Sequence, residues 1–228
     1  MADVAIVTGA GRGIGHATAA CLARRGLSLA LLGHAGPRLD EAAAEITALG
    51  VTARAFPCDV ALEADIERAS ANVLRALGTP RIVVHNAGIV RRGAAVHETL
   101  IADWDDVIAV NLRGPFLLAR ALLPAMLERG RGRHLFVASI SATIGSPGAA
   151  SYAASKWGLV GLAKSLAEEL RGTGLQAMAV LPGSVDTDML TGSGFAPRMT
   201  ADEVASLITY AALDAPDALS GSALEMFG

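Results

Sequence analysis

Short apolar segments alternate with longer helical stretches along this chain, and that alternation constrains its fold most strongly. The segments are rich in Val, Ile and Leu and end near Gly, Asn, Ser or Pro, which is typical of buried strands. They span residues 4–9, 27–33, 81–88, 134–139 and 176–183. The spacing of apolar residues predicts helices over 15–26, 37–50, 62–78 and 155–174. Because parallel strands need a helical crossover between them, we expect an α/β fold, a doubly wound parallel sheet.

Length and composition narrow the class of protein. The 228 residues contain no linker, so we expect one domain over 1–228. Apolar runs are broken well short of the ~18 to 20 residues of a membrane span, and no leader precedes the first strand, which predicts a cytoplasmic, non-membrane protein. A net charge of −3 indicates no nucleic-acid partner, and the arginine-rich stretch 129–134 is typical of a solvated loop. Cys21 and Cys58 lack metal-ligand spacing, so we expect two core thiols and no metal site.

The first strand runs into a glycine-rich turn and then a helix, in the segment "TGAGRGIG". Such a turn aims backbone N–H groups and the positive end of a helix dipole at an anion. The strict G-x-G-x-x-G pattern fails because Ile14 occupies its last glycine position, whereas T-G-x-x-x-G-x-G fits Thr8, Gly9, Gly13 and Gly15. Alone, this loop could be an ordinary tight turn; its strand–turn–helix context favours a dinucleotide site.

More motifs follow in the same chain. They are "CDV" at 58–60, "HNAG" at 85–88, "VNL" at 110–112, "YAASK" at 152–156 and "PGSVDTDM" at 182–189. Together with the glycine loop and a serine thirteen residues before the tyrosine, they make the chain resemble the short-chain dehydrogenase/reductase family, in its single-domain, 3-oxoacyl-ACP reductase-like branch. The resemblance covers nearly the whole chain, and it implies a Rossmann-type fold, a nicotinamide cofactor and hydride transfer.

The cofactor is predicted to be NADP(H), with NAD(H) as the alternative. In this fold an acidic residue ending the second strand accepts hydrogen bonds from the ribose of NAD. Here that strand ends in Gly33 and His34, which are not acidic, while Arg12 and Arg38 could pair with the 2′-phosphate of NADP. The alternative that Arg12 and His34 are simply exposed stays open.

The resemblance implies further cofactor contacts. Asp59 resembles the family's adenine-contacting aspartate, and Val185 and Thr187 resemble positions that anchor the nicotinamide carboxamide. The predicted cofactor-binding set comprises Gly9, Arg12, Gly13, Ile14, Gly15, His34, Asp59, Val60, Asn86, Ala87, Gly88, Tyr152, Lys156, Pro182, Gly183, Val185 and Thr187.

Tyr152 and Lys156 form the predicted chemical centre. The chain has 2 tyrosines, and only Lys156 and Lys164 are lysines among its 19 basic residues. A spacing of four places Tyr152 and Lys156 on one helix face. Y-x-x-x-K is common by chance, but a phenol with a pKa of ~10 needs a stabilised anion to act as acid and base near neutrality. A lysine ammonium supplies this, so we expect Lys156 to lower the pKa of Tyr152; the resemblance implies that Lys156 also binds the nicotinamide ribose.

Ser139 and Asn111 complete the predicted catalytic set. The resemblance implies that Ser139 hydrogen-bonds the substrate oxygen, with Ser141 as the competing candidate, although a serine ending a strand can also be a turn former. It implies that Asn111 holds a water that relays protons. Pro115 has no N–H for the carbonyl of Asn111, so either a helix continues through Pro115 and frees that carbonyl, or Pro115 starts a new helix.

The substrate side departs from the family pattern. Thr200 and Glu203 form a capping box that starts a helix near Ala201. This leaves only 190–199, rich in Gly and Pro, where the family usually has a helical lid. We expect a short, mobile lid and an open pocket, which another subunit could complete. The resemblance implies a homodimer or homotetramer paired through the helix over 117–127 and the helix after Tyr152, although packing on the chain's own sheet explains their small residues equally well.

These observations predict an enzyme that transfers hydride between NADP(H) and a carbonyl or secondary alcohol, with Tyr152 as acid and base. The substrate classes expected are 3-oxoacyl thioesters, small ketones and sugar-like polyols. One alternative is an NAD-dependent alcohol or polyol dehydrogenase that works oxidatively. Another is a nicotinamide-binding regulatory protein without chemistry, which the intact serine, tyrosine and lysine argue against.

Overall fold

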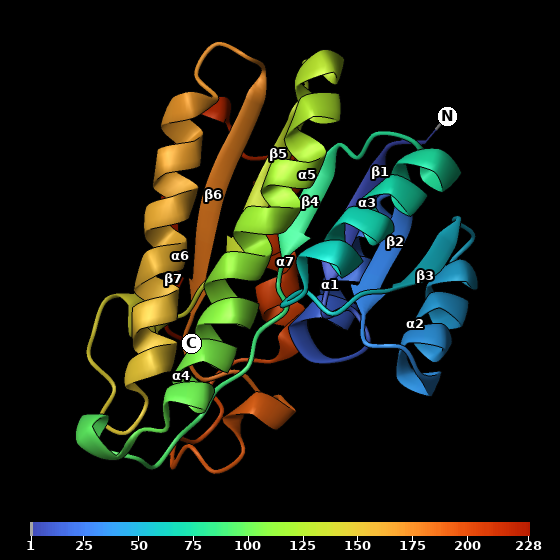
Figure 1. Cartoon of the computed structure of the whole chain (residues 1–228). Coiled ribbons are helices and arrows are strands. Elements are labelled where there is room, and N and C mark those ends of the chain that lie inside the picture. The colour runs from blue at the N-terminus through green and yellow to red at the C-terminus, as the bar shows by residue number, and fades with distance from the viewer. Residues whose placement is uncertain (1) are drawn as a thin grey trace.

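Seven strands form one parallel sheet in the computed structural model, which describes residues 2–228 (Figure 1). The strand order is β3-β2-β1-β4-β5-β6-β7. The strands are β1 (Val4–Thr8), β2 (Ser28–Gly33), β3 (Ala53–Pro57), β4 (Ile82–His85), β5 (Gly132–Val137), β6 (Leu175–Pro182) and β7 (Ala223–Met226). The order reverses direction between β1 and β4, and a doubly wound sheet binds ligands at that switch point. The predicted doubly wound fold is confirmed.

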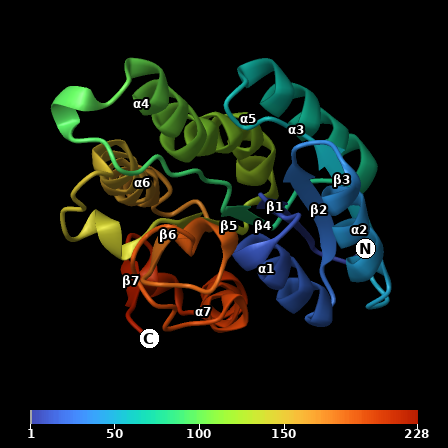
Figure 2. The same cartoon turned by 90° about the horizontal axis from the view of Figure 1, so that it is seen from below.

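Helices cover both faces of the sheet, as the view from below shows (Figure 2). The helices are α1 (Gly13–Arg24), α2 (Pro37–Thr47), α3 (Glu63–Leu77), α4 (Ile101–Ile108), α5 (Gly114–Arg129), α6 (Ala150–Glu169) and α7 (Ala201–Leu213). One apolar core joins the sheet to α3, α5 and α6, and a second joins it to α1, α2 and α7. Because the central strands are buried on both faces, their sequences are continuous apolar runs.

The strands at the two edges of the sheet carry the weakest sequence signals. The residues of β3 and β7 are only partly buried or exposed, so the apolar runs that mark the central strands are missing there. The sequence-based ranges accordingly contain neither edge strand, and they omit α4. The prediction that a helix begins at Ala201 is confirmed, because Thr200 and Glu203 form a reciprocal capping box. Cys58 is buried as predicted, whereas Cys21 is only partly buried; both are free thiols.

A π-helical turn over Ala109–Arg113 joins α4 and α5 into one helix. The helix therefore continues through Pro115, which is the first of the two alternatives left open by the sequence. The joined helix Ile101–Arg129 is the one helix among the described residues that is long and apolar enough to cross a membrane. A buried core helix passes the same test, and Leu122 and Met126 of this helix are fully buried.

Two histidines lie side by side inside the core, on β4 and β5. His85 Nε2 and His134 Nδ1 are 3.1 Å apart and share one hydrogen bond. The other ring nitrogen of each histidine has no hydrogen-bond partner within residues 2–228. Burial lowers the pKa of His134 to about 4, and burial and the neighbouring His134 lower the pKa of His85 well below its usual value. Both rings are therefore neutral at pH 7.

Candidate active site

The carboxyl ends of β1, β4, β5 and β6 bring the predicted site residues together. These ends lie at the lower edge of the sheet in Figure 1, where the segments after β4 and β6 also lie. Asn86 directly follows β4, and Ser139 follows β5 by two residues. Tyr152 and Lys156 lie on the first two turns of α6, beside the same edge.

Three glycines and Asn86 form a close-packed turn, which we call the glycine cradle (Gly9, Gly13, Gly15 and Asn86). Gly9 and Gly13 have positive φ angles of 65° and 55°, which side chains rarely tolerate. A Cβ on Gly15 would lie 2.5 Å from Asn86 Nδ2, and one on Gly13 would lie 3.3 Å from Thr187 Cγ2. Glycine is thus required by the space at Gly15 and by the backbone at Gly9 and Gly13.

Thr8 and Asn86 hold the cradle to the sheet. The Thr8 hydroxyl accepts hydrogen bonds from the backbone N–H groups of Asn86 and Ala87, each at 2.9 Å. Asn86 Nδ2 in turn donates to the Thr8 carbonyl at 2.9 Å. These bonds fix the ends of β1 and β4 relative to each other.

The start of α1 opens onto this cradle. Its N-cap residue, Arg12, makes no side-chain hydrogen bond to the first turn, and that turn carries no acidic residue. Its N–H groups are therefore available to an anion. Small residues, free N–H groups and the switch point fit the pyrophosphate of a dinucleotide, and Ile14 lies partly buried in this first turn.

The three basic residues predicted to favour NADP over NAD lie around the glycine turn and the end of β2. Arg12 forms an ion pair with Asp188, across from the end of β2. His34 is exposed at the end of β2, and the backbone of Arg38 lies beside Gly11 of the glycine turn. A phosphate bound by Arg12 would compete with the carboxylate of Asp188.

Asp59 and Val60 lie at the end of β3, next to α5. The Asp59 carboxylate accepts a hydrogen bond from the backbone N–H of Ala61 at 2.9 Å and so shapes the turn before α3. Val60 is buried, and its backbone lies so close to Gly114 that a Cβ there would be 2.6 Å from the Val60 carbonyl oxygen. The structure thus gives this pair a local structural role, and a cofactor contact remains a proposal.

The phenol of Tyr152 is partly buried against Met189, whose sulfur lies 4.0 Å from the hydroxyl. Burial raises the pKa of Tyr152, while a hydrogen bond from Ser139 and the positive charge of Arg92 act in the opposite direction. The net direction is opposite to the lowering by Lys156 expected from the sequence. The physical reason is that removal from water disfavours the phenolate more than these neighbours favour it.

Lys156 is buried, and Nζ donates to the carbonyl of Val137 at 2.8 Å. Nζ lies 5.6 Å from the centre of the Tyr152 ring. Burial lowers the pKa of Lys156 to about 8. A Cβ on Gly88 would lie 3.6 Å from Nζ, so the glycine leaves room beside the ammonium.

Asn111 lies in the π-helical turn, and its side chain is fully buried. Its Oδ1 accepts from the backbone N–H of Ile89 at 2.8 Å, and Nδ2 donates to the Ile89 carbonyl at 2.9 Å and to Ser155 Oγ at 3.0 Å. The amide therefore joins the segment after β4 to α6, directly beside Lys156. π-helical turns inside α-helices are frequent at functional sites.

Of the two candidate serines, Ser139 is the one that faces Tyr152. Its hydroxyl accepts a hydrogen bond from the N–H of Ser141 at 3.1 Å, and it acts on the pKa of Tyr152. Ser141 Oγ is instead 3.3 Å from Ser146 Oγ. The geometry favours Ser139 over Ser141, as the family resemblance implied.

The 186–199 loop closes this side of the site with few contacts. Pro182 ends β6, Gly183 packs against the carbonyl of Met226, and Val185 pairs with Met199 in a single isolated bridge. The segment 190–199 was predicted to lack a helix. Leu190 ends a short 3-10 turn (Asp188–Leu190), and residues 191–199, all of which the structure describes, contain no helix.

Three residues near the site were absent from the predicted set. Ser155 bonds Asn111, Met189 contacts Tyr152, and Arg92 Nη1 donates to the Met189 carbonyl at 2.9 Å. Ser155 lies inside the "YAASK" motif, which was a usable signal. Arg92 and Met189 meet only through the fold, 97 residues apart in sequence.

The fold and the site define a dinucleotide-binding protein with a serine, a tyrosine and a lysine beside the end of the sheet. The family profile described as short chain dehydrogenase matches residues 3–195. The chain is 34% identical to 3-oxoacyl-[acyl-carrier-protein] reductase of Synechocystis sp., over 97% of this chain and 87% of that protein. It is 34% identical to D-threitol dehydrogenase of Mycolicibacterium smegmatis, over 99% and 91%. The crystal structure of levodione reductase superposes with a TM-score of 0.93 at 27% identity, covering 98% of this chain and 95% of that one.

The chain therefore belongs to the short-chain dehydrogenase family. It is an enzyme, an NAD(P)-dependent oxidoreductase that acts on carbonyl or alcohol groups.

Proposed function

We propose that the protein is an NADP(H)-dependent reductase of ketones or 3-oxoacyl thioesters. The observation that carries the proposal is the convergence of Ser139, Tyr152 and Lys156 at the strand ends that also hold the glycine cradle. The relatives named as 3-oxoacyl-[acyl-carrier-protein] reductases support the reductive direction.

The four catalytic residues have separable roles in this proposal. When bound, the reduced nicotinamide supplies the hydride. Tyr152 donates the proton that the substrate oxygen gains, and Ser139 holds that oxygen by a hydrogen bond. Lys156, with a pKa of about 8, is mostly charged at neutral pH, and we assign its ammonium, 5.6 Å from the Tyr152 ring, the role of offsetting part of the burial that disfavours the phenolate. Asn111 fixes the segment beside Lys156 and supports the return of a proton from solvent.

The preference for NADP(H) rests on charge. No acidic side chain ends β2, where one would repel the 2′-phosphate, and Arg12, His34 and Arg38 lie around the glycine turn. The remaining cofactor contacts follow the predicted set, with Val185 and Thr187 at the nicotinamide end.

The loss of reduced-nicotinamide absorbance tests this function. Purified protein is mixed with an acetoacetyl thioester and either NADPH or NADH. We expect turnover with NADPH, at least about tenfold faster than with NADH at subsaturating cofactor. No reduction of the thioester or of any ketone tested with either cofactor, when both bind, would contradict the reductase assignment.

Polyol oxidation is the second candidate, because D-threitol dehydrogenase is 34% identical to this chain. The same protein, given NAD⁺ or NADP⁺ and a panel of polyols, distinguishes the two. Formation of reduced nicotinamide from a polyol, faster than any thioester is reduced, would favour this candidate.

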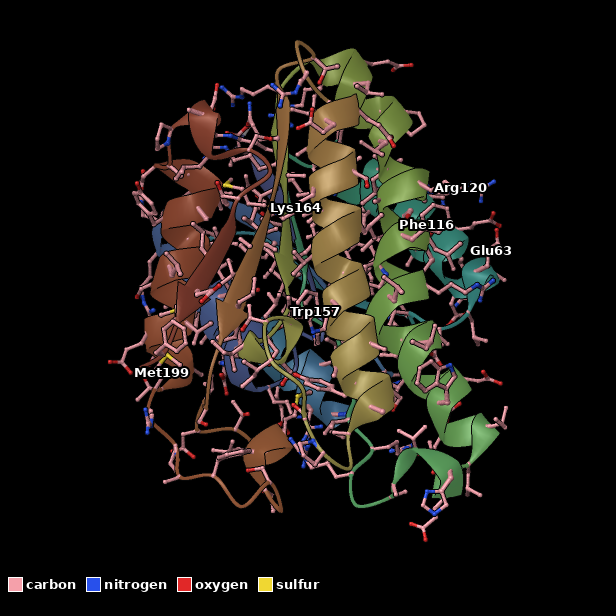
Figure 3. The ribbon with its side chains drawn as sticks, turned by 90° about the vertical axis from the view of Figure 1, so that its left-hand side faces the viewer. Glu63, Phe116, Arg120, Trp157, Lys164 and Met199 are labelled. Atoms are coloured by element: carbon pink, nitrogen blue, oxygen red, sulfur yellow. The ribbon has the colours of Figure 1, made fainter. Side chains whose placement is uncertain are left out.

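We also infer that the protein is cytoplasmic and forms a homodimer or homotetramer. Figure 3 shows α5 and α6 side by side, with Phe116 and Trp157 on this face. These two large apolar residues are 48% and 54% exposed on neighbouring helices, and such a grouping of exposed apolar residues is typical of a protein–protein contact. Light scattering of the wild type and of a Phe116→Glu/Trp157→Glu variant tests this: we expect a monomeric variant with native circular dichroism.

A further inference from the structure

Arg92 lies at the mouth of the site, on the segment that follows β4. Viewed from below, this segment leaves β4 and runs across the end of the sheet past α6 (Figure 2). The backbone N–H of Gly93 donates to the carbonyl of Gly148 at 2.9 Å, four residues before Tyr152. Arg92 is thereby held next to the turn that leads into α6.

Arg92 and Tyr152 both contact Met189. Arg92 Nη1 donates to the Met189 carbonyl, and the Tyr152 hydroxyl contacts the Met189 sulfur. The charge of Arg92 also acts on the phenol, lowering its pKa against the larger effect of burial. The guanidinium therefore lies within electrostatic reach of the reacting group.

The charge of Arg92 is unpaired, which sets it apart from its neighbours. Arg91 bonds Asp103 at 3.2 Å and lies 3.6 Å from Asp106, and Arg12 pairs with Asp188. Within residues 2–228, no carboxylate lies within ion-pair distance of Arg92, whose one protein acceptor is a neutral carbonyl. A guanidinium has five N–H donors, so most of them remain free.

We propose that Arg92 binds an anionic group of the substrate, so that the enzyme acts on oxo acids or hydroxy acids whose carboxylate lies a few bonds from the reacting carbon. The inference rests on the proposed function and narrows it from carbonyl compounds in general to anionic ones. Arginine suits this role because its planar fork binds a carboxylate through two parallel hydrogen bonds. A 3-oxoacyl thioester is neutral at the corresponding position and gains nothing from this charge.

Matched acids and esters test the proposal. With the cofactor that the enzyme prefers, kcat/KM is measured for acetoacetate and methyl acetoacetate, and for levulinate and methyl levulinate. The two pairs place the carboxylate at different distances from the ketone. We expect the wild type to prefer the acid in at least one pair by about tenfold or more, the range of a charge-assisted bond.

Variants separate charge from structural support. Arg92→Gln keeps a donor for the Met189 carbonyl but removes the charge, and we expect it to lose the acid preference while ester turnover stays within about twofold. Arg92→Lys should keep part of the preference. Arg91→Gln is the matched control, because Arg91 is paired with Asp103, and it should leave both substrates unchanged.

Two results would overturn the proposal: no acid preference in either wild-type pair, or an equal loss for acid and ester in Arg92→Gln, which would make Arg92 a support for the 186–199 loop only. Binding is read separately from turnover. Calorimetry of 3-hydroxybutyrate on the protein loaded with NADPH, a pair that cannot react, should show binding at least about tenfold tighter than that of its methyl ester. Absence of turnover with every carbonyl and alcohol would refute the proposed function, while this binding result decides on Arg92 independently.

Discussion

The two halves of the site are built differently. On the cofactor side, the glycine cradle is close-packed, and Thr8 and Asn86 tie β1 to β4 by three buried or partly buried hydrogen bonds of 2.9 Å. On the substrate side, backbone hydrogen bonds between 184–186 and 198–199 join the two ends of the 186–199 loop, while its middle is held by the exposed Arg12–Asp188 ion pair and the contacts of Met189. The first half is specified by backbone geometry, and the second by a few side chains.

This difference indicates which changes the fold tolerates. A substitution in the cradle moves backbone and therefore affects every bound dinucleotide. A substitution in the loop changes a surface contact and therefore affects selectivity. Three substitutions and one change of pH test whether the cofactor side and the substrate side of the site respond independently.

The largest effect is expected from Tyr152→Phe, which removes the proton donor and keeps the ring. We expect kcat to fall by about 10³-fold, within the usual range for an acid–base group, while the dissociation constant of NADPH changes by less than about twofold. Stopped-flow turnover and cofactor fluorescence measure the two quantities. Tyr210→Phe, the other tyrosine, on α7, is the control and should change neither. A parallel loss of cofactor binding would show that Tyr152 belongs to the cofactor half.

Gly15→Ala should disturb the cradle directly. The added Cβ would clash with the backbone carbonyl of Gly9 and meet Asn86 Nδ2 at 2.5 Å, so backbone must shift, and overpacking of this kind costs about 1–3 kcal/mol. We expect NADPH to bind at least about tenfold more weakly and the melting temperature to fall. Gly145→Ala, whose Cβ meets no atom within 4 Å and whose φ is not positive, should leave NADPH affinity unchanged. Equal losses in both variants would contradict the distinction between the halves.

Acid should destabilise the folded protein through His85 and His134, in the core strands that support the cofactor half. Their pKa values are lowered in the folded protein, to about 4 for His134, against 6.5 for the unfolded chain. The unfolded state therefore binds more protons below pH 6.5, and stability is lost as pH falls toward 4. His134 alone accounts for about 2 kcal/mol between pH 7 and pH 5.

Urea unfolding at these two pH values measures that loss. A His85→Leu/His134→Leu variant should lose less stability on acidification than the wild type, and His97→Gln, at an exposed site, should behave like the wild type. A wild type as stable at pH 5 as at pH 7 would be inconsistent with buried neutral rings.

The smallest effect is expected from Asp188→Asn. The substitution removes the partner of Arg12 and leaves it free for the 2′-phosphate of NADP(H). Since both side chains are mostly exposed, we expect only about a two- to fivefold gain in NADPH affinity and no change for NADH. Asp186→Asn is the control. A gain for both cofactors would show that Arg12 does not read the 2′-phosphate.

The sequence predicted the cofactor half better than the substrate half. The roles of Gly9, Gly13 and Gly15 could be predicted because a positive φ or the close approach of neighbouring atoms excludes other residue types at these positions. The central strands could be predicted from their continuous apolar runs, because both faces of these strands are buried. Edge strands β3 and β7 lack that signal, since they are buried on fewer sides.

The substrate half is formed by contacts between segments that are far apart in the sequence. Nothing local marks the contact of Arg92 with Met189, nor the ion pair of Arg12 with Asp188, because each joins loops that only the sheet order brings together. The direction of the shift in the Tyr152 pKa likewise follows from burial. Burial depends on the tertiary structure and cannot be inferred from the spacing of Tyr152 and Lys156.

The π-helical turn at Ala109–Arg113 has a consequence for the length of the chain. Such a turn holds one residue more than a regular turn, so it acts like a single-residue insertion that the helix has absorbed. Deleting one residue there between Asn111 and α5, such as Leu112, would let the helix close into regular α form. It would also turn Asn111 by about 100° relative to α5, away from Ile89 and Ser155. At this position, removing one residue would disturb the site as much as replacing the asparagine.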